Sequence, residues 1–157
     1  MLDVRCWMLA KTTILLPNIQ HLTSNISFIM LDSGSKTAIK SHRDLIVWQK
    51  AMDLVVAVYC ASKGFPKEET YGLIGEMRRA AVSIPANIAE GQGRRLAKEF
   101  QQFLAHARGS LLELDTHLEL ALRLEYLDPA KHAAVHDKLD EVGRLINGLM
   151  RSLNSSI

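Results

Sequence analysis

The chain has 157 residues, a length typical of a single domain. Apolar residues make up 48% and charged residues 23%, which excludes the polar composition of a disordered chain. The net charge is +2, and a mildly basic balance can indicate nucleic-acid binding. That excess lies in residues 1–41, which hold four bases and two acids, whereas residues 42–157 hold fifteen of each. The net charge therefore says nothing in favour of nucleic-acid binding by the rest of the chain.

Secretion and membrane insertion are both disfavoured by the sequence. Two cysteines, Cys6 and Cys60, are too few for a disulfide framework or a thiolate zinc site. The longest apolar run, Leu54 to Ala61, has eight residues, whereas a membrane span needs about 18. The N-terminus is a poor signal peptide, because Asp3 lies where such a peptide is basic. We therefore expect a cytoplasmic protein.

Residues 1–41 show no sustained periodicity, and we expect them to form an irregular or disordered extension. The segment 32–37 has the composition of a linker, and Met30 lies just before it. Two interpretations stay open. Translation starts at Met30 and residues 1–29 are upstream sequence, or residues 1–41 are a loosely docked tail of a bundle domain that spans 42–157.

From Asp44 onward, apolar residues recur at spacings of three and four, which predicts helices. The first predicted helix runs from Asp44 to about Gly64 and is apolar on two faces. One face carries Leu45, Trp48, Met52, Val55 and Tyr59, and the other carries Val47, Ala51, Leu54, Val58 and Ala61. In so short a chain, one face enters the domain core and the other meets another subunit. We assign Val47, Ala51, Leu54 and Val58 to the oligomer interface.

Three further helices follow. The second is predicted over about 69–90, with a kink or break near Pro85, because an interior proline costs ~3 kcal/mol. The third is predicted over about 96–126, with Gly109 in its middle allowing another helix to come close. Asp128 is the expected N-cap of the fourth helix, and Pro129 its first residue. Long helices with short connections predict an all-α fold, an antiparallel up-and-down four-helix bundle.

No arrangement of residues typical of catalysis is found in the sequence. Di-metal bundles use Glu-x-x-His, and this chain contains no such motif. His132 and His136 are four residues apart, as are Glu113 and His117, but exposed histidines or a local ion pair are the simpler interpretation. There is no Gly-x-Ser-x-Gly elbow and no phosphate-binding glycine-rich loop. We expect a non-enzymatic protein with no metal and no cofactor.

The most distinctive segment spans residues 83–95 and is flanked by bases. Its predicted structural motif consists of Ser83, Pro85, Asn87, Glu90, Gly91 and Gly93. Residues 76–98 carry a charge of +3, and their bases are Arg78, Arg79, Arg94, Arg95 and Lys98. Residues 113–128, by contrast, carry −4. The bases could hold phosphates, or they could pair with the acidic stretch while Asn87 and Glu90 fix the turn. The residues alone favour the pairing, because a nucleic-acid-binding domain is normally basic as a whole.

Several strings resemble a known family. They are Leu45-x-x-Trp48-x-x-Ala51, Phe65-Pro66-x-x-Glu69-x-Tyr71-Gly72-Leu73, Asn87-Ile88-Ala89-Glu90-Gly91-x-Gly93-Arg94 and Phe103-Leu104-x-x-Ala107-x-Gly109-Ser110. Over about residues 42–153 the chain resembles the four-helix-bundle family named for the 23S rRNA intervening sequence. One departure is Met77, where glutamine is common in the family.

The resemblance implies a cyclic homopentamer without enzymatic activity. Some members are encoded inside insertions in bacterial 23S rRNA genes. Related proteins accompany reverse transcriptases in diversity-generating retroelements and bind nucleic acid and the polymerase through a basic surface. We therefore expect an oligomer whose basic surface binds RNA or DNA by phosphate contacts, as an accessory to an rRNA insertion or a reverse transcriptase. The bases expected to do so are Arg78, Arg79, Arg94, Arg95 and Lys98. The alternative is a protein-interaction scaffold with no nucleic-acid role.

Overall fold

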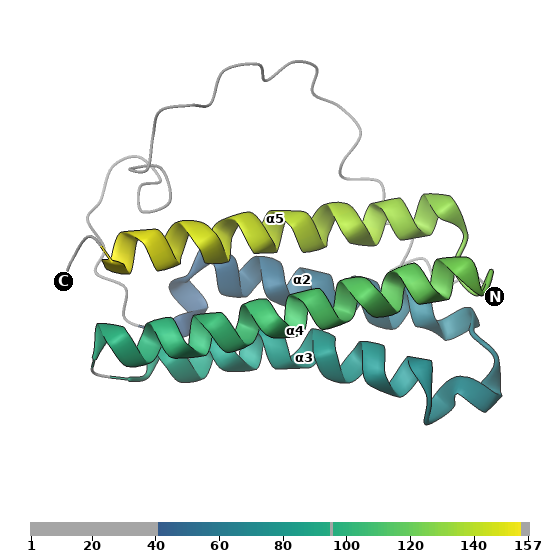
Figure 1. Ribbon diagram of the computed structural model, residues 1–157, viewed down its shortest axis with the longest axis horizontal. Coiled ribbons are helices and arrows are strands. Elements are labelled where there is room, and N and C mark those ends of the chain that lie inside the picture. Colours follow the sequence, from purple (N-terminus) through teal and green to yellow (C-terminus); the bar gives the residue numbers. More distant parts are fainter. Residues whose placement is uncertain (1–40, 95, 155–157) are drawn as a thin grey trace, which may run out of the picture.

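The computed structural model describes residues 41–94 and 96–154 and contains four long helices, α2 to α5 (Figure 1). Their bounds are Ile46–Ala61 for α2, Leu73–Gln92 for α3, Ala97–Arg123 for α4 and Pro129–Asn154 for α5. Three short 3₁₀ helices lie before and after α2, namely η2 (His42–Asp44), η3 (Ser62–Gly64) and η4 (Lys67–Thr70). The described residues contain no strand, and the predicted all-α four-helix bundle is confirmed. The predictions for residues 1–40, including a start at Met30, lie outside the described residues.

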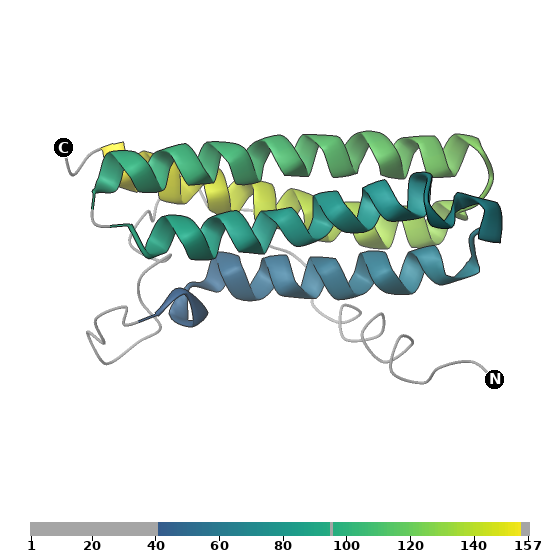
Figure 2. The same cartoon turned by 90° about the horizontal axis from the view of Figure 1, so that it is seen from below.

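The helices form an up-and-down bundle in which each helix packs against two neighbours. The packed pairs are α2 with α3, α3 with α4, α4 with α5, and α5 with α2, and Figure 2 shows the same arrangement from another side. The apolar stripes of all four helices meet in one core. Its largest fully buried side chains include Leu54, Met77, Ile84, Leu114 and Ile146.

Local hydrogen bonds determine where the first two helices begin. Ser41 and Asp44 form a capping box on η2, in which the Asp44 carboxylate accepts a hydrogen bond from the Ser41 N–H at 2.9 Å. The α-helix therefore begins at Ile46, two residues after the predicted start. The side chain of Glu69 accepts from the N–H of Leu73 at 3.0 Å, so Glu69 caps α3 from outside rather than being its first residue.

Two predictions about helix interiors fail: a break of the helix at Pro85, and a close approach of another helix at Gly109. Helix α3 is continuous through Pro85, so a break at that residue is excluded. Pro85 is buried, and its packing in the core offsets the cost of the missing hydrogen bond. Gly109 is exposed, and a Cβ atom at that position would meet nothing within 4 Å. Within residues 41–94 and 96–154, no other helix therefore approaches Gly109 closely.

Helix α4 ends at Arg123 in a Schellman motif, earlier than predicted. The N–H of Tyr126 donates to the carbonyl of Ala121 at 3.0 Å, and the N–H of Glu125 donates to that of Leu122 at 3.0 Å. Glu125 has a φ of 59°, the left-handed conformation that glycine normally supplies at this position. Because the sequence offers no glycine here, apolar periodicity alone predicts a later end of the helix than the structure has.

The N-cap of α5 is confirmed as Asp128. Its carboxylate accepts from the N–H of Lys131 at 2.9 Å and pairs with the Lys131 ammonium group at 2.7 Å. Pro129 follows as the first helical residue, where its missing N–H costs nothing. The hydrogen bond and charge from Lys131 lower the pKa of Asp128 below its ordinary value.

This lowered pKa predicts an acid-dependent loss of stability at the start of α5. Because the pKa is lower in the folded state, the Asp128 carboxylate stabilises the fold above its unfolded pKa, and the contribution disappears as the pH falls through the folded pKa. The Asp128→Asn variant keeps an N-cap but cannot titrate. We expect wild type to be more stable than Asp128→Asn at neutral pH and the difference to vanish in acid, as measured by urea unfolding at both pH values. A difference that is constant with pH would contradict this explanation.

Candidate nucleic-acid interface

Arg78, the first predicted phosphate ligand, is engaged in contacts within the bundle. Its guanidinium lies over the ring of Tyr59, 4.7 Å from the centroid, and its Nε donates to the hydroxyl of Ser62 at 3.0 Å. Ser62 is 1% exposed and Arg78 is half-buried. The side chain therefore joins α3 to the end of α2 and is poorly placed for a phosphate.

The other predicted bases differ in whether they form ion pairs within the bundle. Arg79 is exposed and forms an ion pair with Glu76 on the same helix. Arg94 pairs with Glu90 and lies over the ring of Phe103, 4.9 Å from the centroid. Lys98 is exposed and has no ion-pair partner among the described residues. Arg95 lies outside the described residues.

The predicted bases do not form one patch. Arg78 and Arg79 lie in the first half of α3, whereas Arg94 follows its end. Sixteen residues of helix at 1.5 Å each separate Arg78 from Arg94 by about 24 Å along the bundle. These bases are close in the sequence, which predicts one basic corner. In the fold, Arg78 and Arg79 lie in one half of the bundle and Arg94 lies at the end of the other half.

The charge of the bundle is instead segregated along its length. The hydrogen bond between the hydroxyls of Ser83 and Ser110 marks a level midway along the helices. We call residues 41–53, 83–94, 96–110 and 142–154 the basic half, and residues 54–82 and 111–141 the acidic half. Each half holds seven bases, but the basic half holds four acids and the acidic half eleven. The net charges are therefore +3 and −4, and the difference comes from where the acids lie.

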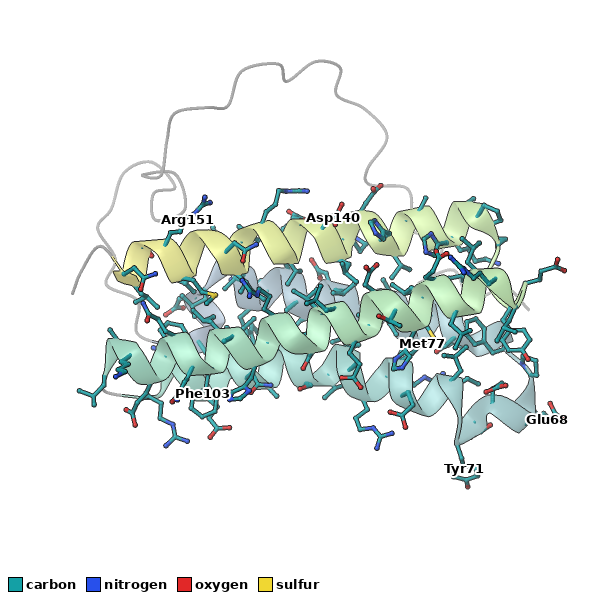
Figure 3. The ribbon with its side chains drawn as sticks, viewed as in Figure 1. Glu68, Tyr71, Met77, Phe103, Asp140 and Arg151 are labelled. Carbon is teal, nitrogen blue, oxygen red and sulfur yellow. The ribbon has the colours of Figure 1, made fainter. Side chains whose placement is uncertain are left out.

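The end of the basic half brings together bases from all four helices or their flanks. Arg43 precedes α2, Arg94 follows α3, Lys98 begins α4 and Arg151 lies near the end of α5. Figure 3 shows Arg151 near one end of the bundle, on the side of Phe103, and Glu68 and Tyr71 at the other end. Within the described residues Arg43, Lys98 and Arg151 are exposed and make no ion pair. Arg43 and Arg151 are far from Lys98 in the sequence, and only the bundle topology brings all three to the same end of the bundle.

The predicted structural motif joins α3 to α4 through a polar network. The side-chain amide of Asn87 donates to the Ser83 carbonyl at 2.8 Å and to the Ser83 hydroxyl at 3.0 Å. The Ser110 hydroxyl donates to Ser83 at 2.9 Å, which extends the network to α4. Pro85 lies between Ser83 and Asn87 on α3, and Glu90 lies further along the same helix, where it pairs with Arg94. These side chains hold two helices in register.

Gly91 and Gly93 have different roles at the end of α3. A Cβ atom on Gly91 would lie 2.6 Å from Cδ2 of Phe100 and 2.7 Å from Cβ of Phe103, so only glycine fits where α4 packs against this turn. Gly93 caps the helix with its backbone N–H, at a φ of −72°, and a Cβ there would meet nothing closer than 3.4 Å. Close packing therefore requires glycine at the first position only.

The assignment of the oligomer interface is wrong. Val47, Ala51, Leu54 and Val58 are 0–5% exposed in the single chain, because this face of α2 packs into the core of the bundle. They can offer no area to another subunit. The opposite stripe is open to solvent: Ile46, Met52, Val56 and Tyr59 are 39–44% exposed, and Trp48 and Val55 are half-buried beside them. The two-faced character of the helix was recognised, but its two faces were exchanged.

The histidines give no metal centre. Nε2 of His136 lies 3.4 Å from Asp115, and its Nδ1 lies 3.7 Å from Asp140. His132 stacks on His136, with ring centroids 5.7 Å apart. Nδ1 of His117 and Nε2 of His132 are buried without a hydrogen-bond partner. In the described part of the chain, no three potential ligands lie close enough together to hold a metal ion.

Among residues 41–94 and 96–154, no helix combines the length and the apolar character that crossing a membrane requires.

Comparison with known proteins identifies the family. The family model described as "23S rRNA-intervening sequence protein" matches residues 43–148, about two thirds of the chain. No curated protein matches the chain. A solved structure from Bacteroides thetaiotaomicron, described as a protein with unknown function from the S23 ribosomal protein family, has a similar fold. Its TM-score is 0.63 at 22% identity, over 68% of this chain and 96% of that one. The match over residues 43–148 shows that this chain belongs to the 23S rRNA-intervening sequence protein family.

Proposed function

We propose that this protein is a non-enzymatic oligomer that binds RNA or DNA through phosphate contacts at the end of its basic half. The observation that supports this most directly is the group of exposed bases, Arg43, Lys98 and Arg151, that lie at one end of the bundle and have no ion-pair partner among the described residues. Arg94 adds a fourth base beside Lys98. Exposed bases gathered at one end of the bundle can replace the counterions of a phosphate backbone.

Arg78 and Arg79 contribute little to this surface. Arg78 is held by Tyr59 and Ser62, and Arg79 lies with Glu76 in the acidic half. Eleven acids in that half repel a polyanion. Nucleic acid is therefore expected to contact one end of the bundle and to avoid the other.

Self-association increases the affinity of such a surface. The exposed stripe of α2, with Met52, Val56 and Tyr59, is the surface we propose for assembly with further copies, in keeping with the homopentamer that the family resemblance implies. Each copy would add one basic end to the assembly. Contacts that are weak on one subunit become strong when several act on the same strand.

The decisive experiment measures the affinity for a labelled RNA and a labelled DNA by fluorescence anisotropy over a range of salt concentrations. We expect wild-type affinity to fall steeply with salt, and the double variant Lys98→Gln, Arg151→Gln to bind at least ~10-fold more weakly with a smaller salt slope. The matched control, Lys67→Gln with Arg79→Gln, also removes two exposed bases, but from the acidic half. This control is expected to bind like wild type. Oligomeric wild-type protein that retains neither nucleic acid at low salt would overturn the proposal.

A second candidate function is a protein-interaction scaffold, and the exposed α2 stripe is the observation that favours it. Ile46, Met52 and Val56 are apolar side chains that one copy of the chain leaves in water. A stripe occupied by a partner protein, such as a reverse transcriptase, would bury the same residues. A pull-down after nuclease treatment tests this function. Recovery of one protein partner with wild type, and loss of that partner with the Val56→Glu variant, would favour it.

A further inference from the structure

We propose that copies of this protein assemble head to tail, with the exposed stripe of α2 in one copy seated in the groove between α4 and α5 of the next copy. This contact rests on the self-association through α2 that is part of the proposed function, and it assigns the surface that receives the stripe. A contact between two different surfaces forms a closed ring when the rotation from copy to copy closes. It therefore agrees with the ring that the family resemblance implies, whereas a stripe-to-stripe contact would stop at two copies.

The stripe and the groove lie on different sides of one chain. Helix α2 packs against α3 and α5, and Figure 2 shows α4 on the far side of the bundle from α2. The groove has Leu111 of α4 and Leu139 of α5 at its base, and Leu112, which is 63% exposed, on its rim. A chain cannot fill its own groove with its own stripe. Because α5 borders the groove and also packs against α2, the two surfaces are not directly opposed, and successive copies turn in one sense.

Contacts within the chain show which residues lie at the same level along the bundle. Lys50 of α2 pairs with Glu141 of α5 at 2.9 Å, and Asp115 of α4 lies 3.4 Å from His136 of α5. Helices α2 and α4 run in one direction along the bundle, and α5 runs in the other. Counting from these two contacts puts positions on the three helices on one scale, to within about one turn of helix.

The apolar centre of the stripe and that of the groove lie at the same level. Counted from the first contact, Met52 is level with Leu139, and counted from the second, Leu139 is level with Leu112. Bundles related by a rotation about an axis parallel to their helices meet without a shift along that axis. Met52 of one copy therefore arrives at Leu112 and Leu139 of the next. Burial of these apolar side chains against each other supplies the driving force for the contact.

Two glycines leave room for the incoming helix. Gly143 lines the groove and Gly109 lies on α4 about one turn before the rim, and a Cβ atom at either position would meet nothing within 4 Å. Both are nearly level with Gln49, an exposed residue one turn before Met52 on α2. Glycine inside a helix is less favourable than alanine, and no contact among the described residues requires it at these two positions. Close approach of α2 from another copy accounts for both.

Charges on the two surfaces are complementary. Asp53 is exposed beside Met52 on α2, Arg108 and Arg144 are exposed in the groove, and none of the three charges takes part in an ion pair among the described residues. Arg144 starts about 9 Å from Asp53 along the bundle, but helical side chains extend toward the N-terminus of their helix, which carries the guanidinium toward Asp53. The two aspartates of the groove lie beside His136 of their own chain, at 3.4 and 3.7 Å. An acid on the stripe thus meets an arginine in the groove.

Two variants that each lose one surface test the contact by mixing. The stripe variant carries Met52→Glu and Val56→Glu, and the groove variant carries Leu112→Glu and Gly143→Glu. We expect each variant alone to associate at least ~100-fold more weakly than wild type, because a carboxylate buried without a partner is costly. In an equal mixture, the intact groove of the first variant binds the intact stripe of the second. Analytical ultracentrifugation should therefore show a dimer of one copy of each and nothing larger.

Three outcomes would overturn the proposal. A groove variant that keeps the wild-type mass would mean that the stripe pairs with a different surface, and a stripe variant that keeps it would remove α2 from the contact. A mixture that stays monomeric would mean that stripe and groove do not bind each other. Formation of the mixed dimer, on the other hand, also shows that both variants are folded.

The matched control places glutamate at two exposed apolar positions outside both surfaces. Tyr71→Glu with Leu96→Glu should keep the wild-type mass. Arg43, Lys98 and Arg151 are intact in every variant. Salt-dependent binding of RNA and DNA by the same proteins therefore separates a failure of this contact from a failure of nucleic-acid binding.

Exchanging the charges of Asp53 and Arg144 tests the register of the contact. Asp53→Arg alone and Arg144→Asp alone should each weaken association at least ~5-fold, because like charges then meet. A chain that carries both substitutions has opposite charges at every contact between copies and should associate within ~3-fold of wild type. Sedimentation over a range of protein concentrations measures all three. A double variant that associates no more tightly than the single variants would overturn this register.

Discussion

Replacing Leu54 by alanine is expected to lower the free energy of unfolding by about 2–5 kcal/mol. The side chain is 0% exposed in the single chain and packs in the core that all four helices share. Alanine at this position would remove three carbons and leave a cavity that packed helices fill only in part. Urea unfolding at several protein concentrations measures the effect.

The concentration series separates a core residue from an interface residue. If Leu54 is a core residue, the loss is the same at every protein concentration, whereas an interface residue would give a loss that depends on concentration. Met52→Ala is the matched control, since Met52 lies on the same helix and is 39% exposed. We expect Met52→Ala to change the stability of the subunit by less than about 1 kcal/mol and to weaken its self-association. A stability loss for Leu54→Ala that depends on protein concentration, together with unchanged self-association of Met52→Ala, would place Leu54 in an interface instead.

The fold was predictable because helices leave a strong periodic signal. Leu139, Val142, Ile146 and Leu149 repeat at spacings of three and four, and all four are buried in α5. Asp128 with Pro129 marked the start of this helix correctly. The ends that were misplaced depend on local hydrogen bonds, such as those around Glu125, for which the sequence holds no typical residue.

The faces of α2 could not be distinguished by apolar periodicity alone. Both stripes are apolar, so periodicity identifies two faces without saying which one meets α3 and α5. The difference lies in side-chain size. Ala51 is small enough to lie at the centre of the bundle, whereas Trp48 and Tyr59 are large and remain partly in solvent. That criterion was present in the sequence and would have given the correct assignment.

The candidate binding surface was less predictable than the fold. Arg94 and Lys98 are near each other in the sequence and in space, but Arg151 joins them only because α5 returns to the same end of the bundle. Arg78 and Arg79 were grouped with Arg94 by sequence distance alone, and α3 separates the two sets. A helical wheel with the antiparallel topology imposed on it would have found Arg151 and set Arg78 apart.

Gly91→Ala is expected to destabilise the protein by about 1–3 kcal/mol, although alanine normally favours a helix by ~1 kcal/mol over glycine. The new methyl group would lie 2.6 Å from Cδ2 of Phe100 and 2.7 Å from Cβ of Phe103. The Phe100 ring can rotate away, but Cβ of Phe103 is fixed to the backbone of α4. The two helices must therefore separate near the turn, which loosens their packing at its tightest point.

Gly93→Ala provides the comparison two residues further on. Its φ of −72° suits alanine, and the nearest atom to the new Cβ is 3.4 Å away. We expect Gly93→Ala to have the stability of wild type or to gain up to about 1 kcal/mol, since alanine restricts the unfolded chain. Thermal and urea unfolding of both variants show whether each substitution lowers or raises the free energy of unfolding. Equal stability of Gly91→Ala and Gly93→Ala would mean that α3 and α4 lie further apart at this turn than the contacts of Gly91 require.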